Sequence, residues 1–518
     1  MEIMSMPNAG WLSLLPPIIA IVLALITKEV ISSLLIGIFT GALIFCKGNP
    51  VEMVTTTFEL MGERIGSNVY IVLFLCLLGT LVVLVTRAGG SAAYGEWASS
   101  KIKTRKGACL ATSALGCFIF IDDYFNCLSV GTVMRPVTDK HRVSRAKLAY
   151  ILDATAAPVC IIAPISSWGA SVATYIQDAN VENGMKTFIN TIPYNLYAIL
   201  TLTMVLIICL TKANFGPMAK FENNAIKYND LHSREQKLDS SNSNVEQKEK
   251  HGKVFDLVIP IVGLIVFSVI AMVYTGGFFS GESSFLDAFG NCDAAFSLVL
   301  GGFAAIVLTA ILFLPRRVVS FKEFMESINQ GIKSMVPAIT ILVLAWTISG
   351  ICNEYHLNTG GFIGLKVTDM IENNPNFPVF IIPMITFAIA GFLAFATGTS
   401  WGTMAIFIPI GVSICQTAQT SPLLLSVLGS ILAGAVYGDH ISPISDTTIL
   451  SSTGAECNHI DHVSTQLVYA TLVAVWCVVG YIIMGFVKSP WVPLVVALAG
   501  LVVSIFIATK MQLKKEVA

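Results

Sequence analysis

The chain has 518 residues, of which 55% are hydrophobic and only 12% carry a charge, and its mean hydropathy is +0.75. This composition excludes a soluble protein of this length, because several apolar runs of about twenty residues match the roughly 30 Å hydrocarbon core of a bilayer. The net charge of -1 argues against a nucleic-acid partner and against a polybasic surface. We therefore expect an all-α polytopic membrane protein.

The first spans are predicted at 11–27, 30–46 and 68–86, with a short interfacial segment at 51–66. Two basic clusters follow, and basic residues near membrane ends favour the cytoplasm. The clusters are Arg87, Lys101, Lys103, Arg105 and Lys106, and then Arg135, Lys140, Arg142, Arg145 and Lys147. If both are cytoplasmic, residues 107–134 enter and leave on the same side, as a re-entrant hairpin. Its middle reads Asp122-Asp123-Tyr124-Phe125-Asn126.

A broken helix and a polar segment complete the first half. The run 148–177 carries one acid near its start, Asp153, and is broken around Pro164. After a further span at 190–211, residues 213–252 are polar, Ser-rich and mixed in charge. This composition predicts a flexible cytoplasmic linker that divides the chain into halves.

The second half repeats this plan. Its spans are predicted at 253–275, 291–314, 331–351, 464–487 and 489–509. The uncharged run 379–416 breaks at 397–402 and predicts a second re-entrant hairpin, and 422–450 is broken around Pro443.

The two halves have opposite predicted orientations, which indicates an inverted-topology repeat. Ile162-Ala163-Pro164-Ile165-Ser166-Ser167 matches Ile441-Ser442-Pro443-Ile444-Ser445-Asp446, and each follows a hairpin break by some forty residues. We expect a first membrane repeat at 1–212, the linker at 213–252, an inverted repeat at 253–487 and an extra C-terminal helix and tail at 488–518. The total is about 11–13 membrane elements, including two hairpins and the broken helices.

Four non-helical breaks are expected, at 122–126, 164–169, 397–402 and 438–447. In inverted-repeat transporters such breaks meet near the bilayer midplane. They supply carboxylates, hydroxyls and unwound carbonyls, the hard oxygen donors that a small cation needs. Intramembrane carboxylates are costly and are normally kept for ion or proton handling.

The candidate ion- or substrate-binding residues lie in or beside these breaks and offer oxygen or imidazole groups. They are Asp122, Asp123, Asn126, Asp153, Ser166, Ser167, Thr399, Ser400, Asp439, His440, Ser442, Ser445, Asp446 and Thr447. The acids expected to hold Na+ are Asp122, Asp123, Asp439 and Asp446.

Each candidate has a structural alternative. Asp122 and Asp123 either face the site or cap the break, and Asp153 either serves the site or pairs with Lys147 or Arg145. His440 is either a proton carrier or a packed, hydrogen-bonded histidine. Trp168 and Trp401, each in a Ser-Trp-Gly triplet, form either a gate or ordinary packing.

These motifs resemble the NhaC family of sodium/proton antiporters, within the ion transporter superfamily. The similar stretches are 120–126, 153–158, 163–170, 397–403 and 438–447, in family order. The resemblance implies secondary transport coupled to sodium and proton gradients, a scaffold with a moving transport domain, a homodimer, and a bacterial cytoplasmic membrane location. It does not fix the solute, because relatives in this group include exchangers of lactate and malate and carriers of amino acids.

The leading hypothesis is sodium/proton antiport at an alternating-access, carboxylate-lined site, with Na+ and H+ as the coupled ions and no resident cofactor. The alternative is sodium-coupled symport or exchange of an amino acid or small organic acid. An enzyme is not expected, because Tyr437-Gly438-Asp439 lacks the Gly-x-Gly-Asp pattern of an intramembrane aspartyl protease and the chain has no Walker-type ATP motif. A channel is disfavoured, since an inverted repeat indicates a moving carrier.

Overall fold

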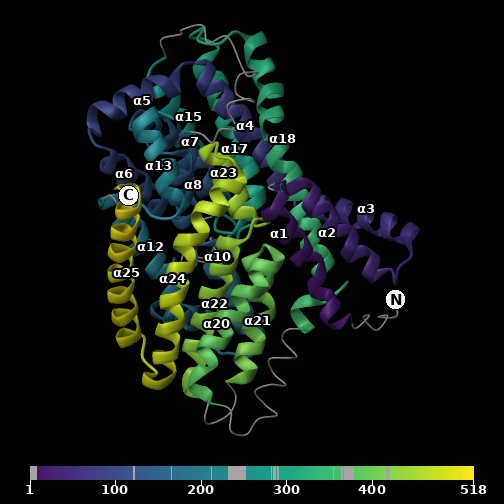
Figure 1. Cartoon of the computed structure of the whole chain (residues 1–518). Helices are drawn as coiled ribbons and strands as arrows, with labels where there is room; N and C mark the ends of the chain where they lie inside the picture. Colours follow the sequence, from purple (N-terminus) through teal and green to yellow (C-terminus); the bar gives the residue numbers. More distant parts are fainter. Residues whose placement is uncertain are drawn as a thin grey trace.

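The computed structural model describes residues 9–27, 29–120, 123–164, 166–211, 213–231, 252–281, 283, 288, 291–353, 355–362, 366, 378–415 and 420–517. Regular structure in these ranges is helical throughout (Figure 1). Seven of the described helices are long and apolar enough to cross a membrane, or up to ten spans if each sharply bent pair is counted as one. The prediction of an all-α polytopic membrane protein is therefore confirmed.

One group of helices is built around the contact between α4 and α18. Helix α17 packs on α4 and α15, and α2 packs on α1 and α18. The group consists of α1 (Leu15–Thr27), α2 (Val30–Phe45), α3 (Pro50–Ser67), α4 (Val69–Arg87), α15 (Phe255–Thr275), α17 (Ala294–Phe313) and α18 (Phe321–Cys352). A bend of 118° separates α2 from α3, so α3 turns away from the bundle, as Figure 1 shows.

The second group contains both hairpins and both broken helices. From the first half come α5 (Gly90–Lys101), α6 (Arg105–Phe118), α7 (Asp123–Lys140), α8 (Arg145–Ala154), α9 (Ala157–Cys160), α10 (Ser167–Asp178), α11 (Gly184–Thr191), α12 (Leu196–Leu210) and α13 (Pro217–Tyr228). From the second half come α20 (Ile382–Thr397), α21 (Ser400–Ile414), α22 (Leu424–Ile441), α23 (Asp446–Ala455), α24 (His459–Val487) and α25 (Trp491–Val517). Its largest apolar core joins α8, α10, α12, α20, α22 and α24.

All four predicted breaks occur, but none has the expected bounds. The break predicted at 164–169 lies between Cys160 and Ser167, where α10 begins, and the break predicted at 397–402 ends before Ser400, where α21 begins. The first hairpin turns between Phe118 and Asp123, so the predicted break at 122–126 is wrong in position: α7 already contains Asp123. The second hairpin turns at Gly398, which has a φ of +67°. Helix α22 continues through Ile441, so the predicted break at 438–447 narrows to 442–445, the residues around Pro443.

The predicted linker is not flexible at its start. Within 213–231, helix α13 packs against α8 and α24, and its Glu222 is fully buried. Two cations and the Ser144 amide compensate that carboxylate, which is why a polar helix can pack here. The rest of the predicted linker, 232–251, lies outside the described residues.

Two helix pairs touch through their backbones. A Cβ atom on Gly131 of α7 would lie 2.7 Å from the backbone of Gly454 in α23. A Cβ on Gly79 of α4 would lie 2.5 Å from the carbonyl oxygen of Gly331 in α18. Small residues permit such close packing of membrane helices. Any larger side chain at these glycines would clash with the backbone of the neighbouring helix.

Candidate ion-binding site

The break between α22 and α23 follows from three residues. Pro443 has no N–H to continue the helix, and Ser442 before it is extended, with a ψ of 127°. The Ser445 hydroxyl then accepts a hydrogen bond from the Thr448 amide at 3.3 Å and starts α23. Asp439 and Asp446 therefore lie on opposite sides of the break.

Asp439 is one of the buried acids with an open carboxylate oxygen, as is Asp153. Its side chain is 1% exposed, and the Ser400 hydroxyl donates to Oδ2 at 2.9 Å. Oδ1 has no hydrogen-bond partner within the described part of the chain. Because a buried carboxylate oxygen is costly to leave unpaired, this atom is the strongest signal of a cation position.

Asp446 is held by the other half of the chain. Tyr124, in the first turn of α7, donates its hydroxyl proton to Oδ2 of Asp446. The Thr447 amide donates to Oδ1 at 2.9 Å. The first hairpin and the second broken helix thus meet at this carboxylate.

The second hairpin also meets the broken helix of the first half, through two tryptophans. The Trp168 indole N–H donates to Oδ1 of Asp123 at 3.0 Å, and the rings of Trp168 and Trp401 lie 4.8 Å apart between centroids. Asp123 is therefore bonded across to α10, and the two Ser-Trp-Gly triplets form one aromatic contact. Asp122 lies outside the described residues.

Asn126 holds the first hairpin closed. Its Nδ2 donates to the carbonyls of Gly116 and Ile119 at 2.7 Å each and to that of Thr155 at 3.0 Å. These carbonyls lie at the end of α6 and at the α8–α9 break, where they lack helical partners. The contacts make the Asn126 amide group a clamp on backbone, while its Oδ1 atom is buried without a described hydrogen-bond partner.

The remaining candidate hydroxyls mostly shape the breaks. Ser166 caps α10 by accepting from the Gly169 amide at 2.9 Å, and Ser442 donates to the Phe395 carbonyl at 2.8 Å. Ser445 and Thr447 lie 3.0 Å apart between hydroxyl oxygens. Thr399 precedes α21 and its carbonyl accepts from Thr403 at 3.0 Å. Ser167 begins α10, and its side chain lies outside the described atoms.

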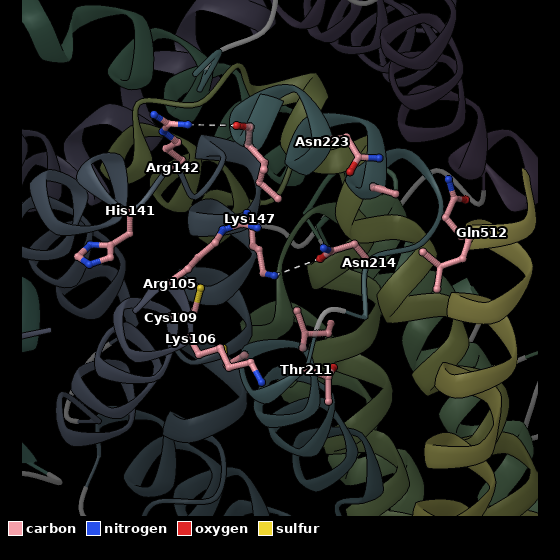
Figure 2. Close-up of a pocket in the computed structure, with 15 residues that line it drawn as sticks. Arg105, Lys106, Cys109, His141, Arg142, Lys147, Thr211, Asn214, Asn223 and Gln512 are labelled. Atoms are coloured by element: carbon pink, nitrogen blue, oxygen red, sulfur yellow. Dashed lines mark hydrogen bonds between the residues drawn. The ribbon is translucent and has the colours of Figure 1, made fainter. Parts of the chain in front are cut away.

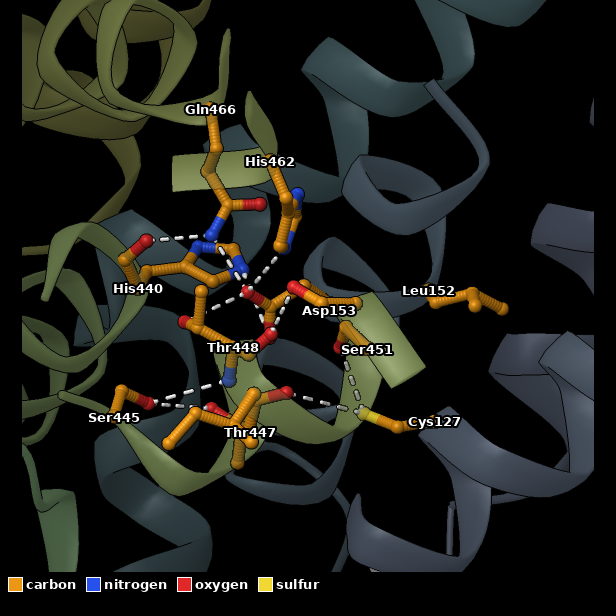
Figure 3. A network of polar contacts seen from close by, with 12 residues as sticks. Cys127, Leu152, Asp153, His440, Ser445, Thr447, Thr448, Ser451, His462 and Gln466 are labelled. Carbon is orange, nitrogen blue, oxygen red and sulfur yellow. Dashed lines mark hydrogen bonds and ion pairs between the residues drawn. The ribbon is translucent and has the colours of Figure 1, made fainter. Parts of the chain in front are cut away.

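Asp153 lies at the centre of a buried polar network that links both halves (Figure 3). Its Oδ2 atom lies 2.6 Å from Gln466 Nε2, 3.1 Å from the Thr448 hydroxyl and 3.3 Å from His462 Nε2. His440 Nε2 lies 3.8 Å from the other oxygen, Oδ1. The expected alternative for Asp153 is wrong, because the described partners of Lys147 and Arg145 are Glu222, Asp139 and Glu456.

His440 is both packed and part of this network. Its Nδ1 atom lies 2.9 Å from the Tyr197 hydroxyl, and its carbonyl accepts from Gln466 Nε2 at 2.5 Å. Gln466 therefore bonds Asp153 and the last turn of α22 at once, next to the break. The sequence reasoning missed Tyr124, Tyr197, Thr448, His462 and Gln466; a buried glutamine and histidine four residues apart on an apolar helix was the available signal.

No three His, Cys, Asp or Glu side chains gather closely enough to hold a metal ion in the described part of the protein. Asp123, Asp439 and Asp446 therefore do not form one compact acid cluster. A cation here would be held by carboxylate, hydroxyl and carbonyl oxygens together, as hard cations prefer.

Comparison with known proteins places these features in a wider group. The family model described as "Na+/H+ antiporter family" matches residues 159–486, which include both sides of the α22–α23 break. An uncharacterized protein of Haemophilus influenzae is 41% identical over 98% of this chain and 97% of its own length. The Malate-2H(+)/Na(+)-lactate antiporter of Bacillus subtilis is 28% identical over 36% of this chain and 42% of its own. The arginine/ornithine antiporter ArcD of Halobacterium salinarum is 25% identical over 46% and 44%.

Proposed function

The chain belongs to the Na+/H+ antiporter family, and from this premise we propose that it exchanges sodium for protons at the α22–α23 break. The observation that carries the proposal is Oδ1 of Asp439, a buried carboxylate oxygen without a described hydrogen-bond partner. Sodium would take this oxygen together with those of Ser400, Asp446 and the unwound backbone.

Sodium and protons compete for the same oxygens in this scheme. When Asp439 and Asp446 are ionised they attract Na+, and protonation removes that attraction. The Tyr124 hydroxyl and the Thr447 amide stabilise the ionised form of Asp446, since both donate to its oxygens. Apparent sodium affinity should therefore weaken as the pH falls.

Asp153 has a positioning role in the proposal. Its Oδ2 atom already faces three donor groups and needs no cation, while Oδ1 has His440 Nε2 at 3.8 Å and no described hydrogen-bond partner. Through Gln466 it holds the last turn of α22, and with it the backbone beside the site. His440 and His462 lie beside Asp153, with Nε2 atoms 3.8 Å from Oδ1 and 3.3 Å from Oδ2.

Wild-type protein in proteoliposomes, with sodium and no organic solute, tests the proposal. Sodium-dependent proton movement, with an apparent sodium affinity that falls at lower pH, is the expected result. Protein-free liposomes and an imposed potassium gradient are the controls. If no proton movement appears at any pH tried, sodium/proton antiport is wrong.

A second function is favoured by the names of two relatives. One is an antiporter of malate and lactate with sodium and protons, and the other exchanges arginine for ornithine. In this alternative the protein couples sodium to the symport or exchange of an amino acid or small organic acid. The same proteoliposomes then move sodium only after such a solute is added.

The proposed setting is the bacterial cell membrane, and the proposed assembly is a homodimer. Both rest on the family resemblance. Chemical crosslinking of the protein in native membranes tests them together, with a band at twice the chain mass as the expected result and a band at monomer mass alone as the contradicting one.

A further inference from the structure

A basic pocket of about 460 Å³ lies away from the breaks, between α6, α8, α12, α13 and α25. Figure 2 shows the side chains of the first hairpin, Arg105, Lys106, Cys109 and His141, opposite Asn214, Asn223 and Gln512. The pocket therefore joins the hairpin to the last helix of the chain. Gln512 and Leu513, close to the C-terminus, line it.

Positive charge dominates the described lining. Arg105, Lys106, Arg142 and Lys147 line the pocket, and no acidic side chain does so among the described lining residues. Behind it, Glu222 pairs with Arg105 and Lys147, the latter at 3.2 Å. Glu222 thus pairs with two of the four cations, and the described lining keeps a surplus of positive charge.

The carboxylate behind the pocket is ionised. Burial alone would raise the pKa of Glu222, but the Lys147 and Arg105 cations outweigh burial and hold that pKa below its ordinary value. Glu222 therefore fixes Arg105 and Lys147 in place and leaves the exposed cations, Lys106 and Arg142, to face a ligand. Lys106 has no described polar partner, and Arg142 donates only to the Ile226 carbonyl, at 3.3 Å.

The inner wall of the same pocket is apolar. Ile208, Cys209, Ala219, Ile226 and Leu513 line it beside the cations. A free inorganic anion would gain nothing from this wall, whereas an amphiphile would contact both surfaces. The basic clusters place this end of the bundle in the cytoplasmic leaflet, which carries anionic lipids.

We propose that this pocket binds the phosphate group of an anionic phospholipid, with Lys106 and Arg142 facing the phosphate and the α12 and α25 side chains contacting the start of an acyl chain. Basic pockets between membrane helices on this side of a bilayer bind lipid headgroups in this way. The lipid joins α25 to the first hairpin.

Binding is measured on the purified full chain by thermal-shift titration with short-chain phosphatidylglycerol, short-chain phosphatidylcholine and inorganic phosphate. Phosphatidylglycerol should stabilise the protein, and the other two should not. The Lys106→Ala/Arg142→Ala variant should bind phosphatidylglycerol about 25-fold more weakly, since each cation near an anionic headgroup contributes about fivefold.

Lys101→Ala/Lys103→Ala is the matched control, because it removes two exposed cations from the same end of the protein but outside the pocket lining. It should leave the lipid affinity unchanged. Stabilisation by inorganic phosphate alone would overturn the lipid assignment, as would equal binding of phosphatidylcholine. Equally weakened binding of phosphatidylglycerol in both double variants would show that the lipid does not bind in this pocket. A melting curve without lipid confirms that each variant is folded.

Discussion

The two halves of this antiporter have helix breaks at matching positions, but the side chains beside those breaks differ. Ser166 and Ser445 occupy matching positions and both cap the helix that follows. One residue later, the first half has Ser167 and the second has Asp446. The backbone plan is shared, but Asp439 and Asp446 beside the second break correspond to Cys160 and Ser167 beside the first, so the carboxylates at these two matching positions belong to the second half alone.

The hairpins show the same division. The second residue of α7, Tyr124, reaches Asp446 of α23, and the second residue of α21, Trp401, reaches Trp168 of α10. Each hairpin thus crosses to the broken helix of the other half. The Tyr124–Asp446 contact is polar and the Trp401–Trp168 contact is aromatic. The two halves therefore share the backbone geometry, but only one of these two contacts places a carboxylate beside the site.

The largest expected effect comes from removing a carboxylate of the second half. Asp439→Asn or Asp446→Asn should weaken sodium binding about a thousandfold, since one charge at about 4 Å contributes about 4 kcal/mol at an effective dielectric of 20. Sodium-driven flux in proteoliposomes is the measurement. Asp293→Asn, at the N-cap of α17, is the control and should retain flux.

The difference between the halves can be tested directly by moving a carboxylate from the second break to the matching position of the first. Asp446→Asn combined with Ser167→Asp puts the carboxylate at the matching position of the first half. We expect no recovery of sodium-driven flux, because the open oxygen of Asp439 lies at the other break. Recovery would show that the halves are interchangeable.

The next largest effect is a loss of stability when the contacts at the first hairpin tip are removed. Asn126→Ala removes a donor from three carbonyls and should lower the free energy of unfolding by about 3 kcal/mol, at about 1 kcal/mol or more for each buried orphan. Differential scanning calorimetry of the purified protein measures it. A variant with wild-type stability would show that Asn126 is not a clamp.

Gly398→Ala tests the second tip. The residue has a φ of +67°, which costs a side chain about 1–2 kcal/mol, and its Cβ would lie 2.6 Å from the Ile444 carbonyl oxygen. We expect lower stability together with weaker sodium binding, because Ile444 lies in the break. Gly402→Ala is the matched control, since its Cβ would meet only a Thr399 methyl group, at 3.2 Å.

A smaller effect distinguishes the two contacts between a hairpin and the broken helix of the other half. Tyr124→Phe removes a hydrogen bond to a carboxylate, so the pH of half-maximal sodium flux should rise by about one unit, which corresponds to about 1.4 kcal/mol. Trp401→Phe, at the matching place in α21, touches no described carboxylate and should leave that pH unchanged. A shift of equal size in both variants would contradict the division described above.

The smallest expected effect is in the polar segment between the halves. Deleting 236–250 should leave sodium flux and membrane insertion largely intact, because these residues are polar and lie outside both repeats. Loss of flux in protein that still inserts would show that the segment regulates transport.

The sequence predicted the backbone plan better than the side-chain partners. Pro443, Pro164 and the uncharged runs mark breaks and spans through local physics, because a proline lacks the N–H that continues a helix. Proline alone does not decide a break, since Pro136, Pro260, Pro337 and Pro409 lie inside α7, α15, α18 and α21. The pairs Tyr124–Asp446 and Gln466–Asp153 join residues some three hundred positions apart, and no spacing rule predicts them. Asp439 and Asp446 were predicted from their cost in lipid, while Glu222 was missed because its helix resembles a solvated linker.

The glycine contacts set where this protein can deform. Helix α7 cannot slide along α23, nor α4 along α18, because backbone meets backbone at Gly131 and Gly79 with no side chain to yield. Between these two pairs the contact includes the rings of Phe74 and Phe125, 6.4 Å apart, and the close approach of Gly90 in α5 to the backbone of Asp256 in α15. A side chain at Gly131 or Gly79 would therefore force the two helices of its pair apart, which makes these glycines fixed points of the packing.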